Sequence, residues 1–125
     1  SRNGRIKETA AVRDRLAQDV LRLKDEITRA VAQETARHEA LRDNAPVLKG
    51  MSEDAREAVA LTSPLYSEGR KSVADLMEVR RAYLQTVEAY EKALMGVWMS
   101  EGRLLFLTGR LDGAAMQALA EEGGL

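Results

Sequence analysis

The 125-residue sequence contains no cysteine and a single histidine, His38. Without cysteine the chain can form no disulfide and offers no thiolate to a metal ion. One histidine is too few for a histidine metal cluster or a histidine-paired nucleophile. No phosphate-binding loop is recognisable, because Gly96 and Gly102 lie in a helical pattern and match no such motif. We therefore expect no enzymatic activity, no metal and no cofactor.

The sequence also has no long apolar run, few aromatic residues and no excess of one charge. No apolar run approaches the roughly 18 residues that a membrane-spanning helix needs. The net charge of −1 gives no general attraction to nucleic acid. Acids are interleaved, as on a solvated helix face, with the basic residues Arg13, Arg15, Arg22, Lys24 and Arg29. The composition, 45% hydrophobic but only 4% aromatic and 31% charged, is typical of long helices.

A heptad pattern runs from Ile6 to Leu65 in one register. Most of its a and d positions are apolar, which favours a coiled-coil helix over about residues 5–63. Position e is partly apolar as well, so this helix can contact two neighbours. The a positions are Ile6, Arg13, Val20, Ile27, Glu34, Leu41, Leu48, Ala55 and Thr62, and the d positions are Thr9, Leu16, Leu23, Ala30, Arg37, Asn44, Met51, Ala58 and Leu65.

Two features interrupt this pattern. The seam turns polar at Glu34, Arg37 and Asn44, which is typical of register specification or a wet interior. Pro46 removes a backbone hydrogen bond, and Gly50 is a residue type that ends helices. Because the register continues across Pro46, we predict one kinked helix rather than two.

Pro64 predicts the end of this helix, because the residue before a proline is pushed out of the α region. A tip over 64–71 follows. Ser72 with Asp75 predicts a capping box at the start of a second helix over about 72–108. Gly109 predicts its end, and a short helix over about 113–121 completes the chain. The second helix has a positions Val73, Arg80, Val87, Leu94, Glu101 and Thr108, d positions Leu76, Tyr83, Tyr90, Val97, Leu104 and Leu111, and apolar e positions Met77, Leu84, Trp98 and Leu105.

The expected fold is all-α: a long antiparallel coiled-coil helical hairpin with unequal helices plus a short C-terminal helix, in a single domain over residues 1–125. The aromatic residues Tyr83, Tyr90, Trp98 and Phe106 are expected in its core. The shorter helix reaches only the later part of the first, so the seam from Ile6 to about Val31 has no partner in the chain. Such a seam must be covered by another chain or by another part of a larger protein. We expect a self-associating piece of an assembly.

The tip and the helix after it carry a characteristic order of residues. It comprises Tyr66, Gly69 and Ser72, an apolar run with an acid over 73–77, and an Ala/Leu/Tyr-rich helix closing on Leu104 and Gly109. The segment from Tyr66 through Asp112 resembles the closing half of the TolC-type outer-membrane efflux proteins. Pro64 and the charged tip residues Glu68 and Arg70 depart from the usual pattern of that family.

The resemblance implies a passive export duct, a trimer whose helices cross the periplasm below a β-barrel that lies outside this sequence. Any contact with the outer membrane would come through that part, and this segment would lie in the periplasm. The hairpin tips would meet a periplasmic adaptor protein, which links the duct to an inner-membrane pump. The implied docking residues are Tyr66, Glu68, Gly69, Arg70, Lys71 and Ser72.

Asp75 and Glu78 match positions where family members carry acids near the pore constriction. Threefold repetition would gather such acids into a ring, which raises carboxylate pKa values and favours cations. The simpler interpretation is a capping acid at Asp75 and a solvated charge at Glu78. The alternative function is a structural or signalling coiled-coil hairpin, such as an efflux adaptor hairpin or a sensor helical bundle. The unequal helices and the trailing short helix count against that alternative.

Overall fold

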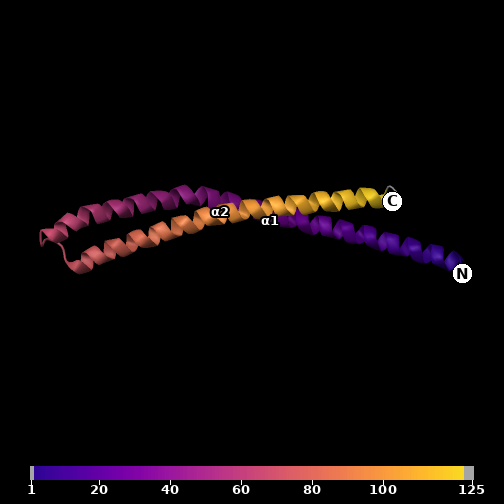
Figure 1. Ribbon diagram of the computed structural model, residues 1–125, viewed down its shortest axis with the longest axis horizontal. Coiled ribbons are helices and arrows are strands. Elements are labelled where there is room, and N and C mark those ends of the chain that lie inside the picture. Colours follow the sequence, from indigo (N-terminus) through magenta and orange to yellow (C-terminus); the bar gives the residue numbers. More distant parts are fainter. Residues whose placement is uncertain (1, 123–125) are drawn as a thin grey trace. The chain divides into compact units, whose positions relative to one another are not determined.

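Two helices account for nearly all of residues 2–122, the part of the chain that the computed structural model describes (Figure 1). Helix α1 spans Arg2–Ser67 and helix α2 spans Val73–Glu122. The helices pack against each other, and no strand occurs within the described residues. The fold class is therefore confirmed as an all-α helical hairpin, with helices of 66 and 50 residues.

The chain divides into two compact units, and each unit combines a segment of α1 with a segment of α2. The first, here called the hairpin unit, comprises residues 37–100 and includes the turn between the helices. The second, here called the terminal unit, comprises the described parts of residues 1–36 and 101–125. Within each unit the segments of α1 and α2 lie side by side (Figure 1).

Helix α1 passes through both of its prolines. Its continuity through Pro46 and Gly50 confirms the prediction of one helix. The predicted end at Pro64 is wrong, because α1 continues to Ser67. The carbonyl of Pro64 accepts a hydrogen bond from the backbone N–H of Glu68 at 3.0 Å, so the last turn forms normally on its C-terminal side. A proline lacks a donor, but it keeps its acceptor.

Helix α2 also passes through the residue that was predicted to end it. It continues through Gly109 to Glu122, so the prediction of a separate short helix over about 113–121 is wrong. A glycine inside a helix costs roughly 0.5–1 kcal/mol relative to alanine. The apolar stripe continues beyond it, where Leu111 is half-buried and Ala114 is buried. Burial of this stripe offsets the local cost.

The buried stripe of α1 follows heptad positions a and e rather than a and d. Val20 and Ile27 at a are buried, and Ala45 at e is buried. Arg37 and Asn44, at d, are exposed. Positions a and e alternate by four and three residues, so they form a heptad stripe as good as the predicted one. Arg37 and Asn44 therefore do not lie in the packed seam. They were placed there because position d was chosen as the second buried position instead of position e.

The buried stripe of α2 follows positions d and g. The d positions were predicted correctly: Leu76 is buried, and the others within the helix are half-buried. Position g was missed because it holds mainly small or polar residues, of which Ala93, Ser100 and Ala114 are buried. Position e, expected to join the seam, instead faces outward at Met77, Leu84, Trp98 and Leu105.

The extension of α2 also covers the later part of the seam that was predicted to lack a partner. In the terminal unit Val20 is 7% exposed and Ile27 is 3% exposed. Ile27 and Arg110 line one common depression, and Arg110 lies beyond the predicted end of the second helix, so this part of the seam packs against the extension of α2. The prediction of an open seam as far as Val31 is therefore wrong. Ile6, which is 60% exposed, marks the part of the seam that stays open.

Gly96 brings the two helices of the hairpin unit close together. A Cβ atom at position 96 would lie 3.2 Å from Cδ1 of Leu41 and 3.3 Å from its Cδ2.

We expect Gly96→Leu to lower the free energy of unfolding by about 1–3 kcal/mol, because the added side chain must displace Leu41. Gly50→Leu is the matched control, since nothing lies within 4 Å of its Cβ position. It should leave stability equal or raised by about 0.5–1 kcal/mol through helix propensity. Urea unfolding followed by circular dichroism compares the two, and equal losses would contradict the close approach.

Candidate functional site: the hairpin turn

The turn over residues 68–72 begins with a helix C-cap built on glycine. Gly69 has a φ of 73°, and it is the one described residue with a positive φ. Its N–H donates to the carbonyl of Tyr66 at 3.0 Å, and the N–H of Arg70 donates to the carbonyl of Leu65 at 2.8 Å. This pair of bonds is the Schellman motif, which satisfies carbonyls at the end of a helix and requires a left-handed residue where Gly69 stands.

The turn ends with a reciprocal capping box. The backbone N–H of Asp75 donates to the Ser72 hydroxyl at 3.1 Å, and the backbone N–H of Ser72 donates to Oδ2 of Asp75 at 3.1 Å. The carbonyl of Ser72 accepts the first helical bond, from Leu76, at 3.2 Å. The sequence motif therefore predicted this cap correctly. Its two bonds satisfy donors that the first turn of α2 would otherwise leave unpaired.

The cap also sets the charge state of Asp75. Its pKa lies below the ordinary value of 3.8, chiefly because of the hydrogen bond from the Ser72 backbone and then the contact with the Ser72 side chain. Slight burial opposes this shift, and the positive charge of Lys71 adds to it. Asp75 is therefore a stable carboxylate in this chain, and the capping role proposed as the simpler interpretation is the one that the geometry forms.

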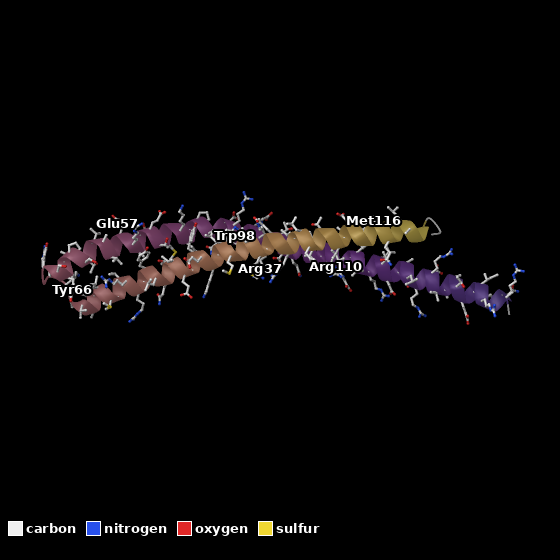
Figure 2. The ribbon with its side chains drawn as sticks, in the orientation of Figure 1. Arg37, Glu57, Tyr66, Trp98, Arg110 and Met116 are labelled. Carbon is white, nitrogen blue, oxygen red and sulfur yellow. The ribbon has the colours of Figure 1, made fainter. Side chains whose placement is uncertain are left out.

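The other predicted docking residues lie around the same turn. Tyr66 is in the last turn of α1 and is 43% exposed (Figure 2). Glu68 and Arg70 form an ion pair of 3.7 Å whose two side chains are both exposed, so it adds little stability. Lys71 is exposed, and its N–H donates to the carbonyl of Leu65. The turn thus presents a short row of charged side chains on a rigid backbone.

Glu78 does not join this arrangement. It lies one turn further along α2 and is exposed, whereas Asp75 is half-buried and directed to Ser72. Within one chain the structure brings together Asp75 and Ser72, not Asp75 and Glu78.

Several large apolar side chains of α2 are exposed, although the sequence analysis placed some of them in the core. Tyr83 and Tyr90 are half-buried as expected, but Trp98 is 70% exposed and Phe106 is 65% exposed (Figure 2). We call this surface the outer face of α2. It comprises Leu84, Met95 and Trp98 in the hairpin unit, and Leu105, Phe106, Met116 and Leu119 in the terminal unit.

The rest of the described chain offers little chemistry. No group of three or more His, Asp or Glu side chains suited to a metal ion occurs among the described residues. In the terminal unit, Arg110 lies over the ring of Phe106, with its Cζ 5.8 Å from the ring centre. In the part of the chain that the structure describes, neither helix has a stretch apolar enough to span a membrane.

Comparisons with known proteins leave the chain unassigned. No protein-family model matches it, and no match is found among curated proteins or solved structures. The geometry of the turn and the exposed faces of the helices therefore carry the functional argument.

Replacing Gly69 tests the Schellman turn. Gly69→Ala should lower the free energy of unfolding by about 1–2 kcal/mol, because alanine pays a steric cost in the left-handed region. Space is not the cause, since nothing lies within 4 Å of the Cβ position at Gly69 or at Gly50. Gly50→Ala, in the middle of α1, should raise stability and serves as the control. A Gly69→Ala variant as stable as the wild type in urea unfolding would contradict the positive φ.

The capping box predicts a specific pH dependence. Because the pKa of Asp75 is lower in the folded chain than its ordinary 3.8, its cap contributes stability above pH 3.8 and loses it as the pH falls further. The gap in unfolding free energy between the wild type and Asp75→Asn should therefore shrink as the pH drops below 3.8.

Ser72→Ala provides the companion variant for this measurement. It should cost about 1 kcal/mol at neutral pH through loss of the hydroxyl cap. It should keep part of the acid dependence, because the backbone N–H at position 72 still donates to Asp75. A gap between wild type and Asp75→Asn that stays constant between pH 6 and pH 2 would show that the cap does not hold the carboxylate.

Proposed function

We propose that this chain is a periplasmic helical hairpin of a TolC-type outer-membrane efflux duct, a passive conduit without an enzymatic step. On this proposal three copies of the complete protein form the duct, and the segment lies in the periplasm. The hairpin turn docks a periplasmic adaptor, which connects the duct to an inner-membrane pump. The proposal combines the sequence resemblance with two structural observations, the turn and the outer face of α2.

The observation that carries the proposal is that α2 is apolar on two sides. One side, at positions d and g, packs against α1. The other is the outer face, where Trp98 and Leu105 are 70% and 77% exposed. A helix in a two-helix hairpin needs only one apolar side, whereas a helix in a wall of helices contacts a neighbour on each side. The outer face thus supports assembly into a larger helical structure.

The turn supports adaptor docking through its rigidity. The Schellman motif and the capping box fix residues 68–72 between two helix ends. A recognition surface built on such a backbone loses little conformational entropy on binding. Glu68, Arg70 and Lys71 present both charges to solvent, and the adaptor tip would meet them there.

Asp75 and Glu78 remain candidates for a pore constriction. In the single chain the capping bonds hold the pKa of Asp75 below 3.8. A threefold ring of these acids would act in the opposite direction, because like charges at short range raise carboxylate pKa values. On this proposal the capping bonds keep the ring charged, and a charged ring favours cations.

A structural coiled-coil hairpin, such as an efflux adaptor hairpin, is the second candidate. Two observations make it more favourable than the sequence suggested. The trailing short helix, which counted against it, is part of α2. The two helices, of 66 and 50 residues, are also closer in length than predicted. Such a hairpin would use the same turn as a docking tip.

Cell fractionation tests the proposal. An antibody raised against the 13.8 kDa chain should detect, in the cells that make the protein, a species of clearly higher mass in the outer-membrane fraction. Mild chemical cross-linking should move that species to three times its own mass. An inner-membrane pump serves as the fractionation control. The antigen in the inner-membrane or soluble fraction would contradict the duct, and its presence with inner-membrane proteins would favour the adaptor hairpin.

A further inference from the structure

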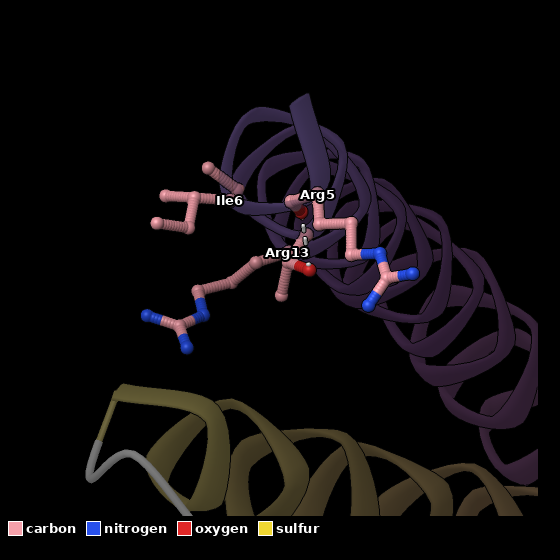
Figure 3. A pocket seen from close by; sticks show the side chains of 5 residues that line it. Arg5, Ile6 and Arg13 are labelled. Carbon is pink, nitrogen blue, oxygen red and sulfur yellow. Dashed lines mark hydrogen bonds between the residues drawn. The ribbon is translucent and has the colours of Figure 1, made fainter. Parts of the chain in front are cut away.

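The first three turns of α1, in the terminal unit, carry a seam that no described residue covers. Arg5, Ile6, Thr9, Ala10 and Arg13 line an open depression of about 320 Å³, which we call the N-terminal seam (Figure 3). Ile6 is 60% exposed. In the view of Figure 3, Ile6 and Arg13 extend to one side of α1 and Arg5 to the other, so the apolar side chain of Ile6 lies beside the guanidinium group of Arg13.

This seam continues an interface that the structure already forms. Ile6 and Arg13 precede Val20 and Ile27 at seven-residue intervals, and both Val20 and Ile27 are buried in the terminal unit. Residues at that interval lie on one stripe of a coiled-coil helix. The N-terminal seam is therefore the same helix face, in a part of α1 whose described residues are exposed.

Glu34 shows how a charged side chain on this stripe is neutralised. Glu34, two heptads after Val20, has a side chain only 13% exposed. The guanidinium of Arg103, from α2, lies 3.9 Å from Oε1 of Glu34. A charge on this stripe is thus met by an opposite charge from the neighbouring helix. Arg13 stands on the same stripe, and no ion pair joins Arg5 or Arg13 to a carboxylate among the described side chains.

We propose that the N-terminal seam binds an amphipathic helix whose apolar stripe is flanked by glutamate or aspartate. Ile6 and Ala10 supply the apolar contact, and Arg5 and Arg13 supply paired, charge-assisted hydrogen bonds to the flanking carboxylates. The charge around the seam also favours an acidic partner, because residues 2–15 hold five basic and two acidic side chains, a net charge of +3. This inference does not depend on the efflux duct, because any assembly can supply such a helix.

The same charges argue against a second copy of this seam as the partner. A twofold pairing places the same surface on both sides of the interface. Arg5 and Arg13 of one copy would then face arginines of the other, and like charges at such a contact are destabilising. The seam is therefore selective for an acidic helix, and self-association of this chain would have to use another surface.

A designed peptide tests the proposal with the full 125-residue chain. The probe is a fluorescent three-heptad helix with leucine at a and d and glutamate at e and g, and its counterpart carries lysine at e and g. Fluorescence anisotropy should show the glutamate peptide binding at least about tenfold more tightly than the lysine peptide. Added salt should weaken the binding. The charge reversal R5E/R13E should invert the preference, and Ile6→Asn should weaken the binding of the glutamate peptide.

A matched variant separates this seam from general charge. K7E/R15E changes the net charge by the same amount at exposed positions outside the depression, so it should keep the preference for the glutamate peptide. The proposal falls if neither peptide binds, if both bind equally, or if K7E/R15E inverts the preference as R5E/R13E does.

Discussion

Reversal of the chain over residues 68–72 is the constraint on which the hairpin depends. One left-handed residue, Gly69, lets the carbonyls at the end of α1 find donors in the turn, and Ser72 starts α2 only three residues later. Because the link is so short and the turn reverses the chain, the second helix runs antiparallel to the first. Every cross-helix contact in the hairpin unit, including the approach of Gly96 to Leu41, follows from the direction and register that this turn imposes.

Apolar burial along the two helices overrides local helix breakers. Pro46, Pro64 and Gly109 each have a cost in a helix, yet both helices continue through them. A proline or glycine affects one hydrogen bond or one residue's entropy, about 1–3 kcal/mol. A stripe of buried side chains on both sides of the breaker offsets that cost, because each fully buried apolar side chain contributes about 1.5–3 kcal/mol. Breakers therefore end helices only where the stripe also ends, as it does at Gly69.

The sequence was sufficient for the hairpin, its turn and the capping box, because each depends on residues close in the chain. The sequence did not show which two heptad positions of each helix pack against the other helix. On α1 the a, d and e positions all hold apolar residues, so periodicity alone cannot select the pair that packs. The small residues at position g of α2, such as Ala93 and Ser100, carry no clear signal in the sequence, yet they are buried. The exposure of Trp98 and Phe106 follows from that choice, since a helix that buries d and g must turn e and f outward.

Two open surfaces of the terminal unit differ in chemistry, and the difference bears on how the chain assembles. The outer face of α2 carries Leu105, Phe106 and Met116 with Gly102, Gly109 and Gly113 between or beside them, none of which has another group within 4 Å of its Cβ position. Such a face suits the close approach of an uncharged apolar helix. The N-terminal seam is narrow and flanked by arginines, so it suits a helix that brings carboxylates. The two surfaces favour different partner helices, since carboxylates that stabilise contact at Arg5 and Arg13 would lose hydration against Leu105 and Met116 without gaining a partner. The terminal unit therefore has the surfaces of a component that contacts at least two different helices.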